Sequence, residues 1–303
     1  MQLTIDQLTK SFGEKQVLKG ISLNAQSGKA VGLLGRNGAG KTTTIRIVMN
    51  VFPPDSGQVL LDGKPLRADQ VKIGYLPEER GLYPKKPILE QLIYLGQLRG
   101  MQTGAARQSA KRLLERLGMS EYLNKKLITL SKGNQQKIQL AATLINDPDI
   151  IILDEPFSGL DPVNAMLLED IVREQIQNHH IVLFSSHQMN YIEEFCDDIA
   201  ILNQGEIVLS GNIREIKRSY DRSKLLLAGP DLEGIRRFAA EECSRLVREV
   251  RKEESVVQVQ LHSAGYKEEL LRAFSNSGLE LDEFRVYEPS LNDIFVAYTE
   301  GAV

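Results

Sequence analysis

The sequence predicts an α/β protein built around a parallel sheet, and two kinds of observation support this prediction. First, three short and continuous apolar runs are typical of strands buried on both faces of a sheet, namely 30–34, 150–153 and 181–184. Second, helical patterns follow these runs, so strand and helix alternate along the chain. Ligands of such sheets bind beyond the carboxyl ends of the strands, so we expect a site where Gly35, Asp154 and His187 follow their strands.

Composition limits the class of protein. The chain has 303 residues, a formal net charge of −3 and a pI near 5.9, which allows about two domains and gives no basic stripe for nucleic acid. Its two cysteines, Cys196 and Cys243, form no C-x-x-C pair, so neither a disulfide framework nor a zinc site is expected. No signal peptide and no long apolar segment is visible. We expect a soluble, cytosolic chain, so any membrane part belongs to another polypeptide.

A glycine-rich loop directly follows the first apolar run. Residues Gly35 to Thr42 read G-R-N-G-A-G-K-T, which matches the G-x-x-x-x-G-K-[ST] phosphate loop between a strand and a helix. The glycines let backbone N–H groups approach an anion, and the following helix adds its N-terminal donors. Lys41 is expected to reach the β- and γ-phosphates, and the hydroxyl of Thr42 is expected to bind Mg²⁺.

Antiparallel strands are predicted before and after this loop. Residues 2–31 alternate apolar and polar positions between turn signals, and residues 58–64 contain an Asp-Gly turn that predicts a hairpin. Residues 73–76 predict one more strand, which Pro77 ends. Phe12 lies in the first turn, where it could stack on an adenine ring or simply pack in the hairpin.

The remaining chain predicts a helical insertion and a C-terminal domain. Residues 87–147 show helical spacing, with a last helix at about 135–146, and form an inserted subdomain of about 79–147. Asp161 and Pro162 predict the N-cap and first turn of another helix. The pattern restarts near residue 218, which predicts a first domain over 1–217 and a small α+β domain over 218–303. The predicted elements of the latter are strands at 225–227, 256–259 and 284–286, helices at 231–242, 266–277 and 290–300, and a solvated, charged stretch at 241–254.

Two adjacent carboxylates follow the second buried strand. Neighbouring residues at a strand end point in different directions, so Asp154 can hold a metal while Glu155 contacts a water aligned for attack. His187 could contact the γ-phosphate or that water from the neighbouring strand. Taken singly, Asp154 could instead be a capping carboxylate and His187 a residue at the start of a helix.

In this order the motifs resemble those of the nucleotide-binding subunit of an ATP-binding cassette (ABC) transporter, over residues 1 to about 217. The resemblance implies a P-loop NTPase fold with an ABC-type core, an antiparallel β subdomain and an inserted helical subdomain. It identifies the following segments as the Walker A loop, the Walker B strand, the D-loop and the signature: Gly35–Thr42, Ile150–Glu155, Ser158-Gly159-Leu160-Asp161 and Leu130–Gln136.

The resemblance also implies the ligands and their residues. The ligands are ATP and Mg²⁺. Glu155, His187 and Lys41 are the implied catalytic residues, and Mg²⁺ is expected at Thr42, Asp154 and Glu78. The implied nucleotide-binding residues are Phe12, Gly35, Arg36, Asn37, Gly38, Ala39, Gly40, Lys41, Thr42, Thr43, Ser131, Gly133 and Asp161.

Three positions depart from the family pattern. Lys132 and Asn134 replace a glycine and the glutamine of the usual L-S-G-G-Q signature, while Ser131 and Gly133 are retained. Glu78 stands where the family usually has glutamine, and it adds negative charge beside the phosphates. These departures and the C-terminal appendage resemble features of the subgroup that serves drug- or ion-extruding permeases.

The resemblance implies ATP hydrolysis coupled to export through a separate membrane permease. Two subunits, in a homodimer or a heterodimer, would pair head to tail, so that each signature covers the γ-phosphate held by the other. The permease would dock from Glu78 into the helical subdomain and would hold the chain at the inner face of the cell membrane.

Two alternatives compete with this interpretation. A soluble ABC protein acting on ribosomes or nucleic acid is disfavoured by the single cassette, the lack of large insertions and the absence of a basic patch. A regulatory cassette with little turnover is disfavoured by the intact catalytic residues Lys41 and Glu155, but Lys132 and Glu78 leave it open.

Overall fold

The computed structural model describes residues 1–300 except 68, 80 and 159. Contacts between Cα atoms divide the chain into two compact units. The first comprises Met1–Ile213 and the segment that starts at Phe295, and the second comprises Arg214–Ile294. This division lies four residues before the boundary proposed from the sequence, after residue 217. The last residues of the chain are grouped with the first unit rather than with the C-terminal domain.

An antiparallel sheet forms the N-terminal part of the first unit. Its strand order is β2-β1-β4-β5, with β1 at Gln2–Phe12, β2 at Lys15–Gln26, β4 at Ser56–Leu61 and β5 at Lys64–Pro65. Asp62 and Gly63 both have positive φ angles, 50° and 76°, which is the geometry that a two-residue hairpin turn needs. The predicted strands and the predicted hairpin are therefore confirmed.

A six-stranded sheet with order β10-β9-β3-β8-β7-β6 forms the centre of the same unit. Five strands are parallel and β10 is antiparallel. The strands are β3 (Ala30–Leu34), β6 (Ile73–Leu76), β7 (Ile150–Asp154), β8 (Ile181–Ser185), β9 (Asp198–Asn203) and β10 (Glu206–Asn212).

The register of the central strands brings the expected site residues to one edge. Every residue of β3, β7 and β8 is buried, as the continuous apolar runs predict. Leu33 of β3 and Asp154 of β7 both pair with Ser185 of β8. The carboxyl ends of the three strands are therefore level, and the loops that follow them start side by side.

A single apolar core joins the two sheets through the helix α1, Lys41–Val48. This helix starts at the glycine loop and places its apolar side chains between the sheets. The core is formed by Leu3 and Ile5 of β1, Ile45 and Val48 of α1, and Val31, Ile152 and Leu183 of the central strands, among others. Packing of α1 between two sheets fixes the position of the loop at its N-terminus.

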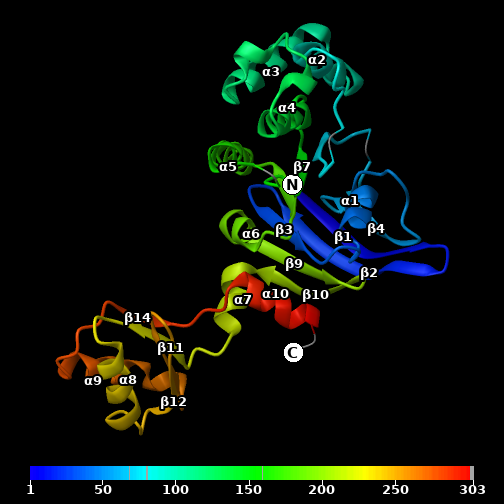
Figure 1. The fold of residues 1–303 in the computed structure, drawn as a ribbon. Helices are drawn as coiled ribbons and strands as arrows, with labels where there is room; N and C mark the ends of the chain where they lie inside the picture. Colours follow the sequence, from blue (N-terminus) through cyan, green and yellow to red (C-terminus); the bar gives the residue numbers. More distant parts are fainter. Residues whose placement is uncertain (68, 80, 159, 301–303) are drawn as a thin grey trace. The chain divides into compact units, whose positions relative to one another are not determined.

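Three helices form the predicted helical insertion, α2 (Ile88–Leu98), α3 (Thr103–Arg116) and α4 (Lys132–Leu144), with short 3₁₀ turns at Ser120–Tyr122 and Leu127–Thr129. Figure 1 shows the three helices gathered together, with α4 nearest to β7. α4 begins three residues before the predicted start at Gln135. The reason is Ser131, whose hydroxyl accepts a hydrogen bond from the backbone N–H of Asn134 at 3.3 Å and caps the helix.

Two further helices of the first unit are α5 (Pro162–Gln177) and α6 (Met189–Phe195), and α7 (Ile213–Ser219) spans the division between the units. Asp161 caps α5, because its side chain accepts a hydrogen bond from the backbone N–H of Asn164, and Pro162 occupies the first turn. The sequence prediction of this cap is confirmed.

The second unit is a four-stranded antiparallel sheet with order β12-β13-β11-β14. Its elements run β-α-β-β-α-β along the chain, which is the split βαβ arrangement of ferredoxin-like domains. They are β11 (Lys224–Ala228), α8 (Leu232–Glu241), β12 (Val247–Lys252), β13 (Val257–Leu261), α9 (Lys267–Asn276) and β14 (Glu283–Val286). The predicted α+β content is confirmed.

One strand of this domain was not predicted. The charged side chains between 241 and 254 are exposed, as expected, but the segment also contains the edge strand β12. The last helix, α10 (Leu291–Glu300), begins in the second unit and ends in the first. None of the helices in the described part of the chain is both long and apolar enough to cross a membrane.

Candidate nucleotide-binding site

The loop between β3 and α1 has little room for side chains at its glycines. Gly40 has a φ of 119°, and a Cβ atom there would lie 2.7 Å from Cδ2 of Leu18. A Cβ atom on Gly35 would lie 2.6 Å from the carbonyl oxygen of Leu202. Neither position accepts another residue without displacing its neighbours. The local structure of Gly35–Thr42 is therefore the bare-backbone turn that a phosphate loop requires.

The side chains of this loop differ in exposure. Those at the tip and at the start of the helix are exposed, namely Arg36, Asn37 and Thr42, together with the backbone of Gly38. Lys41 and Thr43 are half-buried, and Ala39 is buried. Arg36 forms an ion pair with Glu300 at the end of α10. Of the loop residues that the resemblance assigns to the nucleotide, Arg36, Asn37, Gly38 and Thr42 are therefore exposed, whereas Gly35, Ala39 and Gly40 are buried.

Lys41 stands at the centre of a charged cluster. Its Nζ atom donates a hydrogen bond of 2.6 Å to the carbonyl oxygen of Gly35, which closes the loop. Burial lowers the pKa of Lys41, while the carboxylates of Glu155, Asp154 and Glu78 oppose this effect. One lysine thus faces three carboxylates from the strand ends of β7 and β6, and a cation bound here would reduce their mutual repulsion.

Asp154 is buried at the end of β7. The hydroxyl of Tyr75 donates a hydrogen bond of 3.2 Å to its Oδ2 atom. Burial raises the pKa of Asp154, while the hydrogen bond from Tyr75 and the charge of Lys41 act in the opposite direction. Burial and the charge of Asp154 also raise the pKa of Tyr75 to about 12, so this hydroxyl is a donor at neutral pH. Tyr75 is a site residue that the sequence analysis did not find.

Glu155 and His187 are paired. The carboxylate of Glu155 is buried and accepts three hydrogen bonds, from Oγ of Ser186 at 2.9 Å, the backbone N–H of His187 at 2.9 Å and Nδ1 of His187 at 2.7 Å. Its backbone adopts φ = 49°, a conformation that non-glycine residues rarely take. The side chain of His187 is 67% exposed. These two residues lie together as the sequence analysis expects, and the histidine faces solvent.

Phe12, which the sequence places in the first turn, is the last residue of β1 and directly precedes the turn to β2. Its ring packs edge-on against Phe52, with centroids 5.5 Å apart, and remains 50% exposed. Nζ of Lys10 lies 5.8 Å from one ring centroid and 5.6 Å from the other, and it pairs with Asp55 at 2.8 Å. Half of the Phe12 ring therefore stays exposed and is available to stack on an adenine ring.

The signature residues and the D-loop aspartate form a second cluster. A Cβ atom on Gly133 would lie 2.7 Å from Nδ2 of Asn164 and 3.7 Å from Oδ2 of Asp161, so the N-termini of α4 and α5 meet closely here. Ser131 caps α4 and Asp161 caps α5. Among the described residues, no hydrogen bond or ion pair joins this cluster to the Lys41 loop. Gly159 of the predicted D-loop lies outside the described residues.

Glu78 is exposed beyond the end of β6, and α4 supports the chain around it. The side-chain amide of Gln139 donates hydrogen bonds of 3.2 Å to the carbonyl oxygens of both Pro77 and Glu79. The charge of Glu78 is close enough to raise the pKa of Lys41. Glu78 therefore lies near the charged cluster, although its exposed carboxylate has no fixed protein partner among the described residues.

The residues present suit Mg²⁺ bound together with phosphate. Within the described ranges, no group of three or more acidic, histidine or cysteine side chains could hold a metal by itself. Mg²⁺ keeps several waters and commonly takes one or two protein ligands plus substrate phosphates. A buried Asp154 beside Lys41 and the exposed hydroxyl of Thr42 at the helix start match such an incomplete protein ligand set.

The central parallel sheet, the glycine loop and the paired carboxylates define the chain as a P-loop ATPase with the insertion that characterises ATP-binding cassettes. Comparison with known proteins assigns it further: residues 18–158 match the family described as ABC transporter, and residues 211–299 match the C-terminal domain of DrrA1-3-like ATP-binding proteins. The chain belongs to the family of ABC transporter ATP-binding proteins, whose members hydrolyse ATP to power transport, work with transmembrane permeases and dimerise.

Individual relatives agree with this assignment. The chain is 39% identical over 295 residues to YhaQ, an uncharacterized ABC transporter ATP-binding protein of Bacillus subtilis, with 97% of each chain covered. It is 35% identical over 213 residues to the linearmycin resistance ATP-binding protein LnrL of the same organism, covering 69% of this chain and 68% of LnrL. The solved dimeric structure of a bacterial ABC transporter cassette matches with a TM-score of 0.63 and 26% identity, covering 70% of this chain and 99% of that one.

Proposed function

We propose that the chain hydrolyses Mg²⁺-ATP as one of a pair of cassettes and powers export of a drug-like or ionic substrate through a separately encoded permease. The observation that carries this proposal is the arrangement of Lys41, Asp154, Glu155 and His187 around the mouth of one phosphate loop. Similarity to a linearmycin resistance protein and to the DrrA-like C-terminal domain supports export. The direction of transport and the substrate class are proposals.

Each residue has a distinct proposed role in binding. Backbone N–H groups from Gly35 to Thr43 and the Nζ atom of Lys41 would bind the β- and γ-phosphates, and Phe12 would stack on the adenine. Thr42 and Asp154 would hold Mg²⁺, with Glu78 nearby, and the bound ion would neutralise part of the phosphate charge. On nucleotide binding, Lys41 would exchange its bond to the Gly35 carbonyl for phosphate oxygens.

Glu155 is the proposed general base. Its Oε1 atom already accepts two hydrogen bonds from His187, whereas Oε2 accepts one from Ser186. A carboxylate oxygen can accept two bonds, so Oε2 retains an acceptor site for a water molecule. His187, held by Glu155 and exposed on its other side, would contact the γ-phosphate. The same pair would thus place the water and detect the phosphate.

A second subunit would complete the site. Ser131, Gly133 and the N-terminus of α4 would cover the γ-phosphate bound by the other copy, because a helix N-terminus with a hydroxyl favours anions. Lys132 adds a positive charge at this end of the helix. Val163 and Met166 near the start of α5 are 76% and 64% exposed, and apolar exposure beside Asp161 supports a partner surface there.

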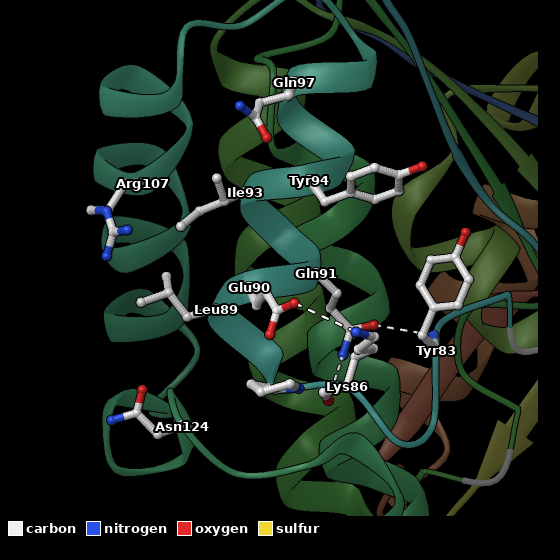
Figure 2. Close-up of a pocket in the computed structure, with 11 residues that line it drawn as sticks. Tyr83, Lys86, Leu89, Glu90, Gln91, Ile93, Tyr94, Gln97, Arg107 and Asn124 are labelled. Carbon is white, nitrogen blue, oxygen red and sulfur yellow. Dashed lines mark hydrogen bonds and ion pairs between the residues drawn. The ribbon is translucent and has the colours of Figure 1, made fainter.

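The permease would dock on the helical insertion. A cavity of about 790 Å³ opens beside α2, and Figure 2 shows Tyr83 and Tyr94 along one side of it. Both tyrosines are about half exposed, and their rings meet edge to face with centroids 6.4 Å apart. The buried side chain of Gln91 bonds to the backbone of Tyr83 and Lys86, which ties the loop to α2. This site suits one face of an amphipathic permease helix.

Co-purification tests the proposed function. The tagged chain is expressed with its genomic neighbours, and its partners are identified from detergent-solubilised membranes. We expect a multi-span membrane protein that stimulates ATP turnover, and loss of that turnover in Glu155→Gln. Tyr83→Ser combined with Tyr94→Ser should lose the membrane protein and retain ATP binding. Recovery of ribosomes or DNA without any membrane protein would contradict the transport proposal, and an ATP-binding wild-type complex without turnover would favour the regulatory alternative.

A further inference from the structure

Four aromatic rings form a continuous stack beside the candidate catalytic residues. Phe157 lies at its centre, with ring centroids 4.0 Å from Tyr191, 5.8 Å from Phe184 and 5.6 Å from Phe195. The interplanar angles of these three contacts are between 15° and 21°. Arg173 lies over Phe195, 4.8 Å from its centroid. Phe157 is only 4% exposed, so the stack is anchored in the interior.

The closest pair of rings joins the loop after β7, which carries Glu155, to the helix α6, which follows His187. Phe157 follows Glu155 by two residues, and Tyr191 follows His187 by four residues. Ser186 and His187, in the short segment between β8 and α6, donate hydrogen bonds to Glu155. The loop that carries Glu155 and the segment from Ser186 to Tyr191 are therefore connected twice, by hydrogen bonds to Glu155 and by the stacked rings of Phe157 and Tyr191.

Glu155 needs such support because of its backbone. Its φ of 49° lies in the left-handed region, where a residue with a side chain persists only if its surroundings fix it. Two hydrogen bonds also reach this turn: the backbone N–H of Glu155 donates to the carbonyl oxygen of Ser185 at 2.8 Å, and the side-chain amide of Gln136 on α4 donates to the carbonyl oxygen of Pro156 at 3.2 Å. Phe157 is thus the apolar anchor of a strained turn.

We propose that the Phe157–Tyr191 stack is a positioning element, which holds the Glu155 carboxylate against His187 in the geometry that hydrolysis requires. This inference rests on the proposed function, because it assigns a role to residues that support the candidate base. Tyr191 is the more informative member. It is half-buried at the outer end of the stack, and its hydroxyl has no protein hydrogen-bond partner among the described residues. Its ring, rather than its hydroxyl, makes the contact.

The test compares Tyr191→Leu with Tyr191→Phe in the full-length protein. Tyr191→Leu removes the stacked ring, and we expect kcat for ATP hydrolysis to fall by about tenfold to a hundredfold, because small displacements of a catalytic group have effects of this size. KM for ATP should change by less than about twofold, since the phosphate loop is untouched. Tyr191→Phe keeps the ring and should retain the wild-type kcat.

A matched control and a second measurement separate positioning from general stability. Phe238→Leu removes a half-buried helical aromatic that packs on Phe274 in the second unit, and it should leave kcat unchanged. Hydrogen exchange of the His187 amide needs no turnover, because this N–H donates to Glu155. It should exchange at least about tenfold faster in Tyr191→Leu and at the wild-type rate in Tyr191→Phe.

The outcomes distinguish the two proposals. A wild-type protein without turnover would contradict the proposed function, and the exchange of the His187 amide would still decide the positioning role. An active wild type together with a fully active Tyr191→Leu would overturn the positioning role alone. Equal losses of kcat in Tyr191→Leu and Phe238→Leu would overturn it as well, since such losses would reflect stability.

Discussion

The hydroxyl of Tyr75 provides a sharp test of the metal site. It donates a hydrogen bond of 3.2 Å to Oδ2 of Asp154, which is buried, while Tyr75 itself is half-buried. Tyr75→Phe removes this single donor and keeps the ring, so the packing between β6 and α4 is preserved. Asp154 then loses the hydroxyl donor that favours its charged form. Its orientation toward a bound cation becomes less fixed.

The expected magnitude follows from the geometry of this bond. Hydrogen bonds to charged groups contribute about 1.5–3 kcal/mol, and an O–H to carboxylate distance of 3.2 Å is longer than the usual 2.5–2.7 Å, which favours the lower value. About 1.4 kcal/mol corresponds to a factor of ten. Loss of a partner behind a metal ligand typically reduces metal affinity by about tenfold to a hundredfold. We therefore expect the Mg²⁺ concentration for half-maximal turnover to rise about tenfold.

The assay measures ATP turnover against Mg²⁺ concentration. ATP binding in the presence of a chelator should be the same in wild type and Tyr75→Phe, because the phosphate loop is unchanged. Tyr94→Phe is the matched control, since Tyr94 is 46% exposed on the helical insertion and far along the chain from Asp154. An unchanged Mg²⁺ dependence in Tyr75→Phe would refute the assignment of Asp154 as a magnesium ligand supported by Tyr75.

Three further predictions concern the N-terminal cap of α4, the stability of the protein at acid pH, and the packing of β6 against α4. Ser131→Ala should lower stability by about 1 kcal/mol through loss of the α4 cap, whereas Ser131→Asp should keep the melting temperature but abolish turnover by repelling phosphate. The side-chain hydrogen bond from Lys10 lowers the pKa of Asp55, so its stabilising contribution is present above about pH 4 and is lost as the pH falls through the folded pKa. The melting temperature should therefore depend less on pH, between pH 2 and 6, in Asp55→Asn than in the wild type. Gly74→Ala places a Cβ atom 2.6 Å from the carbonyl oxygen of Thr143 and should cost about 1–3 kcal/mol in chemical denaturation.

Each of these predictions has a clear contrary result. Equal turnover in Ser131→Asp and wild type would remove Ser131 from the phosphate contact. Identical acid unfolding of wild type and Asp55→Asn would show that the Lys10–Asp55 pair does not stabilise the turn beside Phe12. Wild-type stability of Gly74→Ala would mean that β6 and α4 can separate at no cost.

The sequence predicted those parts of the fold whose signals are local. The buried strands β3, β7 and β8 are continuous apolar runs, and the turn at Asp62-Gly63 and the cap at Asp161 each depend on a few adjacent residues. The proximity of Glu155 and His187 was also predictable. Both follow strands of one parallel sheet, and the carboxyl ends of such strands meet at the same edge.

The bond between Tyr75 and Asp154 could not be predicted, because it depends on which strands are neighbours. Tyr75 pairs with Ile152 across β6 and β7, two strands that are more than seventy residues apart in the sequence. Nothing in the short segment around Tyr75 distinguishes it from an ordinary half-buried strand residue. The stacking of Phe157 on Tyr191 could not be predicted for the same reason, since it joins the loop after β7 to the helix α6, and only the sheet brings these two segments together.

Two further differences arise from competing local signals. The sequence of β12 does not show the alternation of apolar and polar residues that predicts a strand. It is an edge strand rich in charged residues, and only Val247 is buried. The predicted start of α4 followed the apolar residues and therefore missed its first turn, where Ser131 caps a polar segment. In both cases hydrogen bonds determine where the strand or helix lies, whereas the apolar pattern marks only the residues that pack in the core.

ATP-dependent pairing of Glu155→Gln measures the central claim most directly. Glutamine has nearly the same shape as glutamate, so it retains the fold and the phosphate loop while removing the proposed base. The mass of the purified variant in solution is determined by light scattering with and without Mg²⁺-ATP. The account predicts a monomer that becomes a stable dimer only with ATP, together with a loss of turnover of about a hundredfold or more. A variant that stays monomeric with ATP, or that hydrolyses ATP at the wild-type rate, would contradict it.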